Sequence, residues 1–125
     1  TEEEKADEDS KIGDAFTIAE FVMGVNETTE ADLPETVLAW DLVRAVNMAR
    51  WAFICGYINE DEMWEAIRTT AGIAKESFSS WEEYGNSFAV GRGIWRGETD
   101  DYETADEVVG ALLNKEDSPW KAIEW

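Results

Sequence analysis

The sequence contains no histidine and only one cysteine, and these two shortages limit the chemistry open to it. Histidine is the commonest metal ligand and the usual general base near neutral pH. Cys55 can form no intramolecular disulfide, and a catalytic cysteine would need a histidine beside it. The apolar residues around Cys55 predict a buried free thiol. We therefore expect no catalytic residue, no metal site and no cofactor, and hence a protein that is not an enzyme.

Basic residues are also scarce, because 10 lysines and arginines stand against 29 acidic residues, for a net charge of -19. Nucleic acids and anionic membranes bind to basic surfaces, so this charge argues against both as partners. It favours a basic protein, which the field of the molecule would attract. Acidity also keeps proteins soluble, so solubility alone stays open as its role.

Long apolar runs are missing as well. No stretch could span a membrane and no signal peptide is visible, so we expect a cytoplasmic protein. The chain of 125 residues is 44% hydrophobic, enough to form one domain with its own core.

Helix start and stop signals are frequent, whereas strand alternation and hairpin turns are not seen. Capping patterns occur at Asp32 with Glu35, Asn59 with Glu62, Ser79 or Ser80 with Glu82 or Glu83, and Thr104 with Glu107. Gly56 and Gly97 are expected to end two of the helices. Helices are expected over about 14–23, 33–55, 60–74, 81–96 and 105–113, and the terminal "SPWKAIEW" is expected to fold back onto them.

These signals predict an all-α protein, a compact single-domain bundle of about five helices with a central buried helix over 33–55. Residues 1–11 are acidic and lack apolar periodicity, so they are expected to be a frayed tail or a linker remnant. The domain itself is then expected to cover residues 12–125.

The stretch "AWDLVRAVNMARWAFICGYI" over 39–58 looks apolar all round, yet polar side chains recur in it every three residues. At helical spacing, one face is aliphatic and the opposite face sets these polar residues among tryptophans. Two buried faces are typical of a helix with neighbours on both sides. The polar residues are Asp41, Arg44, Asn47 and Arg50.

The helix expected over 81–96 offers a matching aromatic face. Glycines at 85, 91 and 93 would let another helix approach closely. We expect Arg44 or Arg92 to pair with Asp41 and to stack on tryptophans. One interpretation is a buried network that fixes helix register. The other is a cleft walled by Trp40, Trp51 and Trp95 that binds an anionic ligand or a partner's carboxylate. The candidate binding residues are Asp41, Arg44, Asn47, Arg50, Arg92 and Trp95.

Long motifs in these segments resemble the bacterial family catalogued as domain of unknown function 1266. They are "AWDLVRAVNMARWAFICGYINEDEMWEAI", "SSWEEYGNSFAVGRGIWRG" and the terminal "SPW…W", and the similarity covers about Leu33 to Trp125. Val43 departs from the family pattern, which often has a glycine there, so packing at this point is expected to differ slightly. The resemblance implies an α-helical domain and no particular activity. It rests on Trp40, Asp41, Arg44, Asn47, Arg50, Gly56, Tyr57, Trp81, Glu82, Gly91, Arg92 and Trp95.

Three hypotheses for function follow. The first is an acidic protein-binding module, such as an inhibitor or immunity protein for a basic toxin, with Asp100, Asp101, Tyr102 and Glu103 facing the partner. Trp120, Trp125 or Tyr102 would supply hydrophobic anchors. The second is a sensor or binding domain for a small anion held by Arg44 and Arg92. The third is a structural domain of a larger protein, and the oligomeric state stays open.

Overall fold

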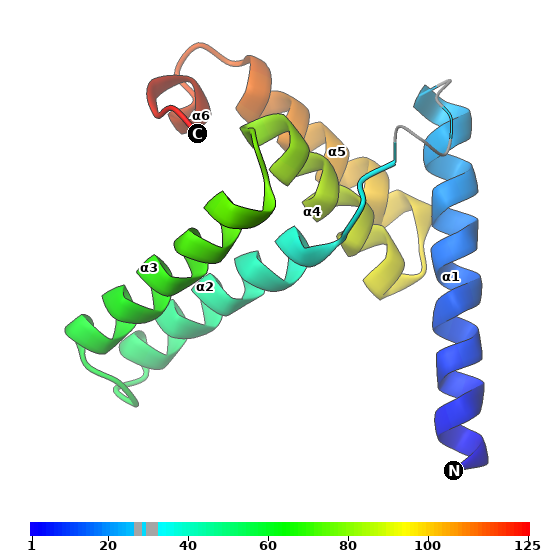
Figure 1. Ribbon diagram of the computed structural model, residues 1–125, viewed down its shortest axis with the longest axis horizontal. Helices are drawn as coiled ribbons and strands as arrows, with labels where there is room; N and C mark the ends of the chain where they lie inside the picture. Colours follow the sequence, from blue (N-terminus) through cyan, green and yellow to red (C-terminus); the bar gives the residue numbers. More distant parts are fainter. Residues whose placement is uncertain (27–28, 30–32) are drawn as a thin grey trace.

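A computed structural model describes residues 1–26, 29 and 33–125 of the chain. Within these residues the secondary structure is entirely helical, which confirms the all-α bundle (Figure 1). The helices are α1 (Glu2–Asn26), α2 (Leu38–Ile54), α3 (Glu60–Ser77), α4 (Trp81–Arg96), α5 (Thr99–Asn114) and the single turn α6 (Pro119–Ala122).

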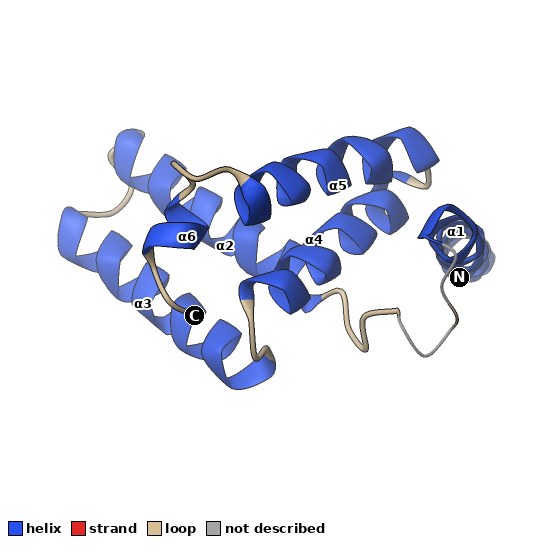
Figure 2. Ribbon diagram, turned by 90° about the horizontal axis from the view of Figure 1, so that it is seen from above, coloured by secondary structure: helices blue, strands red, loops and turns tan. Residues whose placement is uncertain are grey.

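Helix α4 lies at the centre of the bundle. It contacts α1, α2 and α5, as Figures 1 and 2 show from two directions. Helices α2 and α3 form an antiparallel hairpin that extends to one side of this centre (Figure 1). The expectation of a central helix over 33–55 is therefore wrong, because α4 covers only the first part of α2. The central helix is instead the one rich in small residues, with buried positions at Gly85, Ser87, Ala89, Val90, Gly91 and Gly93.

Two groups of buried side chains hold the bundle together by removing apolar surface from water. The larger group joins α1, α4 and α5, and it consists of Ile18, Val22, Ala89, Val90, Tyr102, Ala105 and Val109. The smaller group lies where the hairpin meets α4, and it consists of Ala39, Leu42, Ala74 and Phe78.

The helix signals that act locally are confirmed. The Asn59 side chain accepts a hydrogen bond from the Glu62 N–H, and the Glu62 carboxylate accepts one from the Asn59 N–H. Ser80 rather than Ser79 caps α4. Gly56 and Gly97 have φ angles of 79° and 73°, the left-handed conformation that follows many helices.

Three predicted helix starts are wrong. Helix α1 begins at Glu2 rather than near residue 14, so residues 1–11 are helical and not a frayed tail, and three glutamates in its first turn suit the helix dipole. Helix α2 begins at Leu38, after Pro34 and Glu35, while the expected cap at Asp32 lies outside the described residues. Helix α5 begins at Thr99, a full turn before Thr104, again with aspartates in its first turn.

The start of α2 is capped from another helix. Its own N-cap residue, Val37, offers no side-chain hydrogen bond. The Thr36 hydroxyl accepts a hydrogen bond from the Leu38 N–H at 3.1 Å, and Ser87 of α4, which is completely buried, supplies a second capping group. The Ser87 hydroxyl accepts a hydrogen bond from the Ala39 N–H at 3.2 Å and donates one to the Thr36 carbonyl at 2.7 Å. The Ser87 side chain thus joins α4 to the backbone just before and just after Leu38, the first residue of α2.

Ser87→Ala is expected to lower the free energy of unfolding by about 2 kcal/mol, because it leaves two backbone groups without a partner. Urea unfolding followed by tryptophan fluorescence measures this change. Ser10→Ala, at an exposed position of α1, is the matched control and should change stability by less than about 0.5 kcal/mol. Equal stabilities for the two variants would show that Ser87 does not hold α2.

The C-terminal segment folds back as expected. The ring of Trp120 stacks on that of Trp81 with centroids 4.9 Å apart. The Trp125 indole N–H donates a hydrogen bond to the Phe78 carbonyl at 2.8 Å. Trp120 and Trp125 therefore pack against their own chain, and both remain partly exposed. The same aromatic cluster buries Tyr84, and this burial raises the pKa of the Tyr84 hydroxyl.

Candidate functional site

Two arginines and two tryptophans interleave where α2 crosses α4. Trp40 and Arg44 lie one turn apart on α2, and Arg92 and Trp95 lie on neighbouring turns of α4. The tryptophan ring centroids are 5.7 Å apart. The Arg44 guanidinium carbon lies 5.3 Å from the Trp95 ring and 5.8 Å from the Trp40 ring. We call these four residues the Arg–Trp cluster.

The cluster depends on a close approach of the two helices. A Cβ atom on Gly91 would lie 2.5 Å from the Cβ of Trp40, so only glycine lets α2 approach α4 this closely. The predicted packing role of glycines 85, 91 and 93 is confirmed, since a side chain at each of them would meet another helix. Gly85 faces Val109, and Gly93 faces Tyr102.

Ion pairs fix Arg92 but not Arg44. Arg92 pairs with Asp101 of α5 at 2.9 Å, and Arg96 approaches the same carboxylate at 3.5 Å. Arg44 is in no ion pair with any described carboxylate. The expected pairing of Asp41 with Arg44 or Arg92 is therefore wrong. The expected placement of one of these arginines on tryptophan rings is confirmed, and the structure shows it for both.

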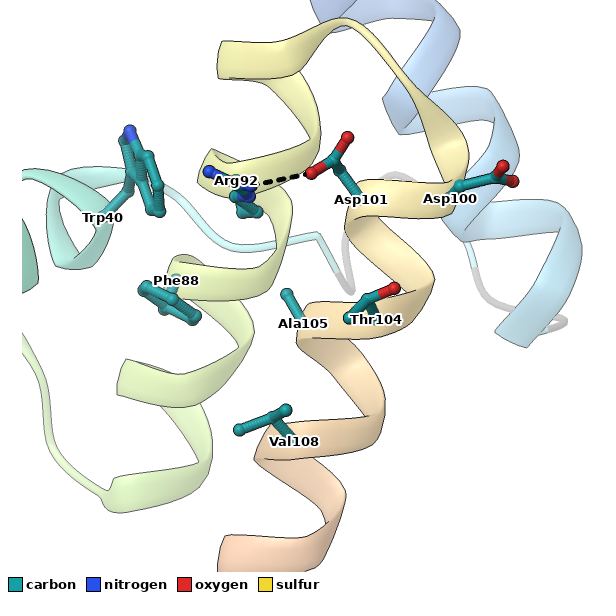
Figure 3. Close-up of a pocket in the computed structure, with 8 residues that line it drawn as sticks. All are labelled: Trp40, Phe88, Arg92, Asp100, Asp101, Thr104, Ala105 and Val108. Carbon is teal, nitrogen blue, oxygen red and sulfur yellow. Dashed lines mark ion pairs between the residues drawn. The ribbon is translucent and has the colours of Figure 1, made fainter.

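A pocket of about 450 Å³ opens beside the cluster, between Trp40, helix α4 and helix α5 (Figure 3). The side chains of Phe88 and Arg92 form part of its wall, and the dashed line in Figure 3 marks the pairing of Arg92 with Asp101. The residues lining the pocket are Trp40, Phe88, Arg92, Asp100, Asp101, Thr104, Ala105 and Val108.

Beyond the cluster, the same face of α2 lies open to solvent. Met48 and Trp51 follow Arg44 at helical spacing, and each is 61% exposed. Cys55 comes one turn later and is exposed too, so the predicted burial of its thiol is wrong. We call Arg44, Met48, Trp51 and Cys55 the outer stripe of α2.

The predicted burial of the polar row is wrong. Asp41, Arg44 and Arg50 are exposed, and Asn47 is half-buried. The structure brings only Arg44 of this row together with Arg92 and Trp95. Of the expected cleft residues, Trp40 and Arg92 line the pocket, whereas Arg44, Trp51 and Trp95 do not.

The four residues predicted to face a partner divide into two kinds. Asp100 and Glu103 are exposed at the start of α5. Asp101 is held by arginines, and Tyr102 is only 3% exposed, with its ring edge against Phe21. A partner cannot reach Tyr102, because it belongs to the core.

Sequence reasoning missed the contribution of α5 to the site. Asp101, Thr104, Ala105 and Val108 recur at helical spacing and so lie on one face. A helix start at Thr99 would have revealed this pattern, because it brings Asp101 onto the same face as Val108.

Residues 1–26, 29 and 33–125 contain no group of three or more cysteine or acidic side chains placed to hold a metal ion. The helices in the same ranges are each too short or too polar to cross a lipid bilayer.

Comparison with protein-family models identifies a family for the chain. The model described as "Protein of unknown function (DUF1266)" matches residues 1–125. The chain belongs to this family. The resemblance expected from Leu33 onward is thereby confirmed, and the match extends through α1. No curated protein and no solved structure matches this DUF1266 chain.

The DUF1266 family has no assigned activity, and the side chains of the site show what it could bind. Among the described residues, the buried indole N–H of Trp40 has no hydrogen-bond acceptor. Arg44 adds a guanidinium whose N–H groups make no hydrogen bond to a described residue. The Arg–Trp cluster therefore offers hydrogen-bond donors without acceptors among the described residues, beside a flat aromatic surface.

Proposed function

We propose that this DUF1266 protein is a non-enzymatic module that binds a basic protein through the outer stripe of α2. The observation that carries the proposal is the exposure of Met48 and Trp51, two large apolar side chains on one face of a projecting helix. Tryptophan and methionine are enriched in the centres of protein interfaces, where burying them against a partner supplies much of the binding energy.

Charge supports the choice of a basic partner. The net charge of -19 produces a field that attracts basic proteins and repels acidic ones over the range of a Debye length. Acidic side chains are exposed on α2 itself, at Asp41, and at the start of α5, at Asp100 and Glu103. An inhibitor or immunity protein that masks a basic toxin is the specific form of this function that we propose.

The shortage of catalytic groups supports a binding role. The sequence offers no histidine, and its single cysteine has none to act as its base. The acidic residues at the starts of α3 and α5 serve in helix caps, first turns and the ion pairs of Asp101.

Trp51→Asp is expected to abolish capture of the partner from the native lysate, because it places a charge in the apolar centre of the interface. The assay uses N-terminally tagged protein at moderate salt, with mass spectrometry of what is retained. Phe16→Asp, on α1 and 69% exposed, is the matched control and should retain the partner. Both variants place an aspartate at an exposed aromatic position, so both are expected to fold.

The captured protein should be basic and should be released as the salt concentration rises, since screening weakens exposed charge pairs. Retention of the same protein by the Trp51→Asp variant would contradict the role of the outer stripe. Loss on Phe16→Asp with retention on Trp51→Asp would place the interface on α1 instead.

A further inference from the structure

We propose that the Arg–Trp cluster binds a carboxylate group of the protein partner, with Arg44 as the residue that holds it. This inference deepens the proposed function and rests on it for the source of the carboxylate. Its physical basis lies in the arrangement of charge, hydrogen-bond donors and rings around Arg44.

The first argument is the distribution of positive charge. The chain has five arginines, and three of them lie on or beside the Arg–Trp cluster: Arg44, Arg92 and Arg96. One described carboxylate, that of Asp101, pairs with two of the three, and Arg44 has no described carboxylate partner. Arg44 therefore offers a positive charge that no described carboxylate pairs with, although Asp41 on the same helix and Asp100 on α5 are also exposed nearby.

The second argument is the orientation of the Arg44 side chain. Its guanidinium lies over the faces of two indole rings, at 5.3 Å and 5.8 Å from their centroids. Stacking uses the flat face of a guanidinium and leaves the N–H groups on its edge for hydrogen bonds. A planar carboxylate matches two of those N–H groups at once. Because the rings already restrain Arg44, little side-chain freedom is lost on binding.

The third argument selects a carboxylate over a phosphate. The negative field of the molecule repels a doubly charged phosphate more strongly than a singly charged carboxylate. The same negative field attracts the lysines and arginines of a basic partner. It therefore favours a carboxylate carried by a basic chain over a free acid. The carboxylate of a basic protein can pair with Arg44 while the rest of that protein is attracted by the net negative charge.

The fourth argument concerns what lies on either side of Arg44. The pocket shares Trp40 with the Arg–Trp cluster, and its wall of Trp40, Phe88 and Val108 can receive an apolar side chain of the same peptide, on the side away from Asp100 and Asp101. Met48 and Trp51 continue the surface along α2 in the other direction. The site therefore suits a carboxylate within a peptide chain, with apolar contacts on both sides of it.

The test uses the peptide N-acetyl-Lys-Lys-Phe with a free C-terminal carboxylate, and the same peptide as its C-terminal amide. The carboxylate form is expected to bind at least about tenfold more tightly, the range measured for hydrogen bonds to charged groups. Isothermal titration calorimetry gives the affinities, and the shifts of arginine Nε–H signals in NMR spectra report the site.

Arg44→Gln should weaken binding of the carboxylate form by roughly tenfold or more and leave binding of the amide unchanged. Arg44→Lys should recover only part of the loss, because lysine keeps the charge but lacks the planar fork. Arg68→Gln, at an exposed position of α3, is the matched control and should bind both peptides as the unaltered protein does.

Equal affinity for the carboxylate and the amide, or no saturable binding of either, would overturn the proposal. A free small acid, phenylacetate, binding as tightly as the peptide would also overturn it, by making the site one for small acids. Failure here and failure of the proposed function are distinguishable. The capture assay depends on Trp51 and an intact partner, whereas the peptide assay depends on Arg44 and needs no partner.

Discussion

Ile18→Ala is expected to lower the free energy of unfolding by about 3 kcal/mol, the middle of the range for truncating a buried isoleucine. Ile18 of α1 is completely buried against α4 and α5. Its side chain lies next to Gly93, where an added Cβ would be 3.2 Å from it. Truncation leaves a cavity there, because neighbouring helices anchored elsewhere cannot close it fully. Chemical unfolding monitored by circular dichroism measures the change.

Ile12→Ala on the same helix is the matched control for this prediction. Ile12 is 56% exposed, so its truncation removes little buried area and should change stability by less than about 0.5 kcal/mol. The pair of variants tests whether α1 belongs to the cooperative core. Equal effects at the two positions would show that α1 is not packed as described.

Gly91→Ala is expected to destabilise the protein by about 2 kcal/mol, in spite of the better helix propensity of alanine. The added Cβ would lie 2.5 Å from the Cβ of Trp40 and 3.2 Å from the carbonyl oxygen of Val37. Both atoms are fixed to the backbone of α2 or its approach, so α2 as a whole has to move away from α4. The movement separates Trp40 from Trp95 and should also weaken peptide binding at Arg44.

Gly72→Ala is the control with the same change in propensity and no steric conflict, since nothing lies within 4 Å of the new atom. It should stabilise the protein by up to about 1 kcal/mol. Urea unfolding of both variants against the parent protein measures the difference in sign. A stabilising effect of Gly91→Ala would mean that the two helices do not approach at this glycine.

The contrast between predicted and observed helix ends has a physical origin. The capping of α3 and α4 was predictable because the groups involved lie within a few residues of each other, as at Asn59 and Glu62. The start of α2 was not, because the hydroxyl that caps the Ala39 N–H comes from Ser87, 48 residues away. A local pattern contains no information about a cap supplied from another helix.

The candidate site shows the same division. The aromatic face of α4 and its glycines predicted the crossing with α2 and the stacking of arginines on tryptophans. Helical periodicity identifies a face but does not tell whether the same chain covers it, so the sequence predicts a second buried face where the structure has the exposed outer stripe. The partner of Arg92 was also misassigned, since Asp41 and Asp101 were both available and only the true start of α5 decides between them.

The projection of the α2–α3 hairpin has a consequence for local opening. Past its junction with α4, few of its side chains are buried, namely Ala49 and Met63. Backbone amides in the outer half should therefore exchange with deuterated water through openings that cost much less than global unfolding. A partner seated on this half adds its binding free energy to the cost of those openings. A partner bound to this surface should therefore slow amide exchange at the end of the hairpin and leave exchange in α5 unchanged.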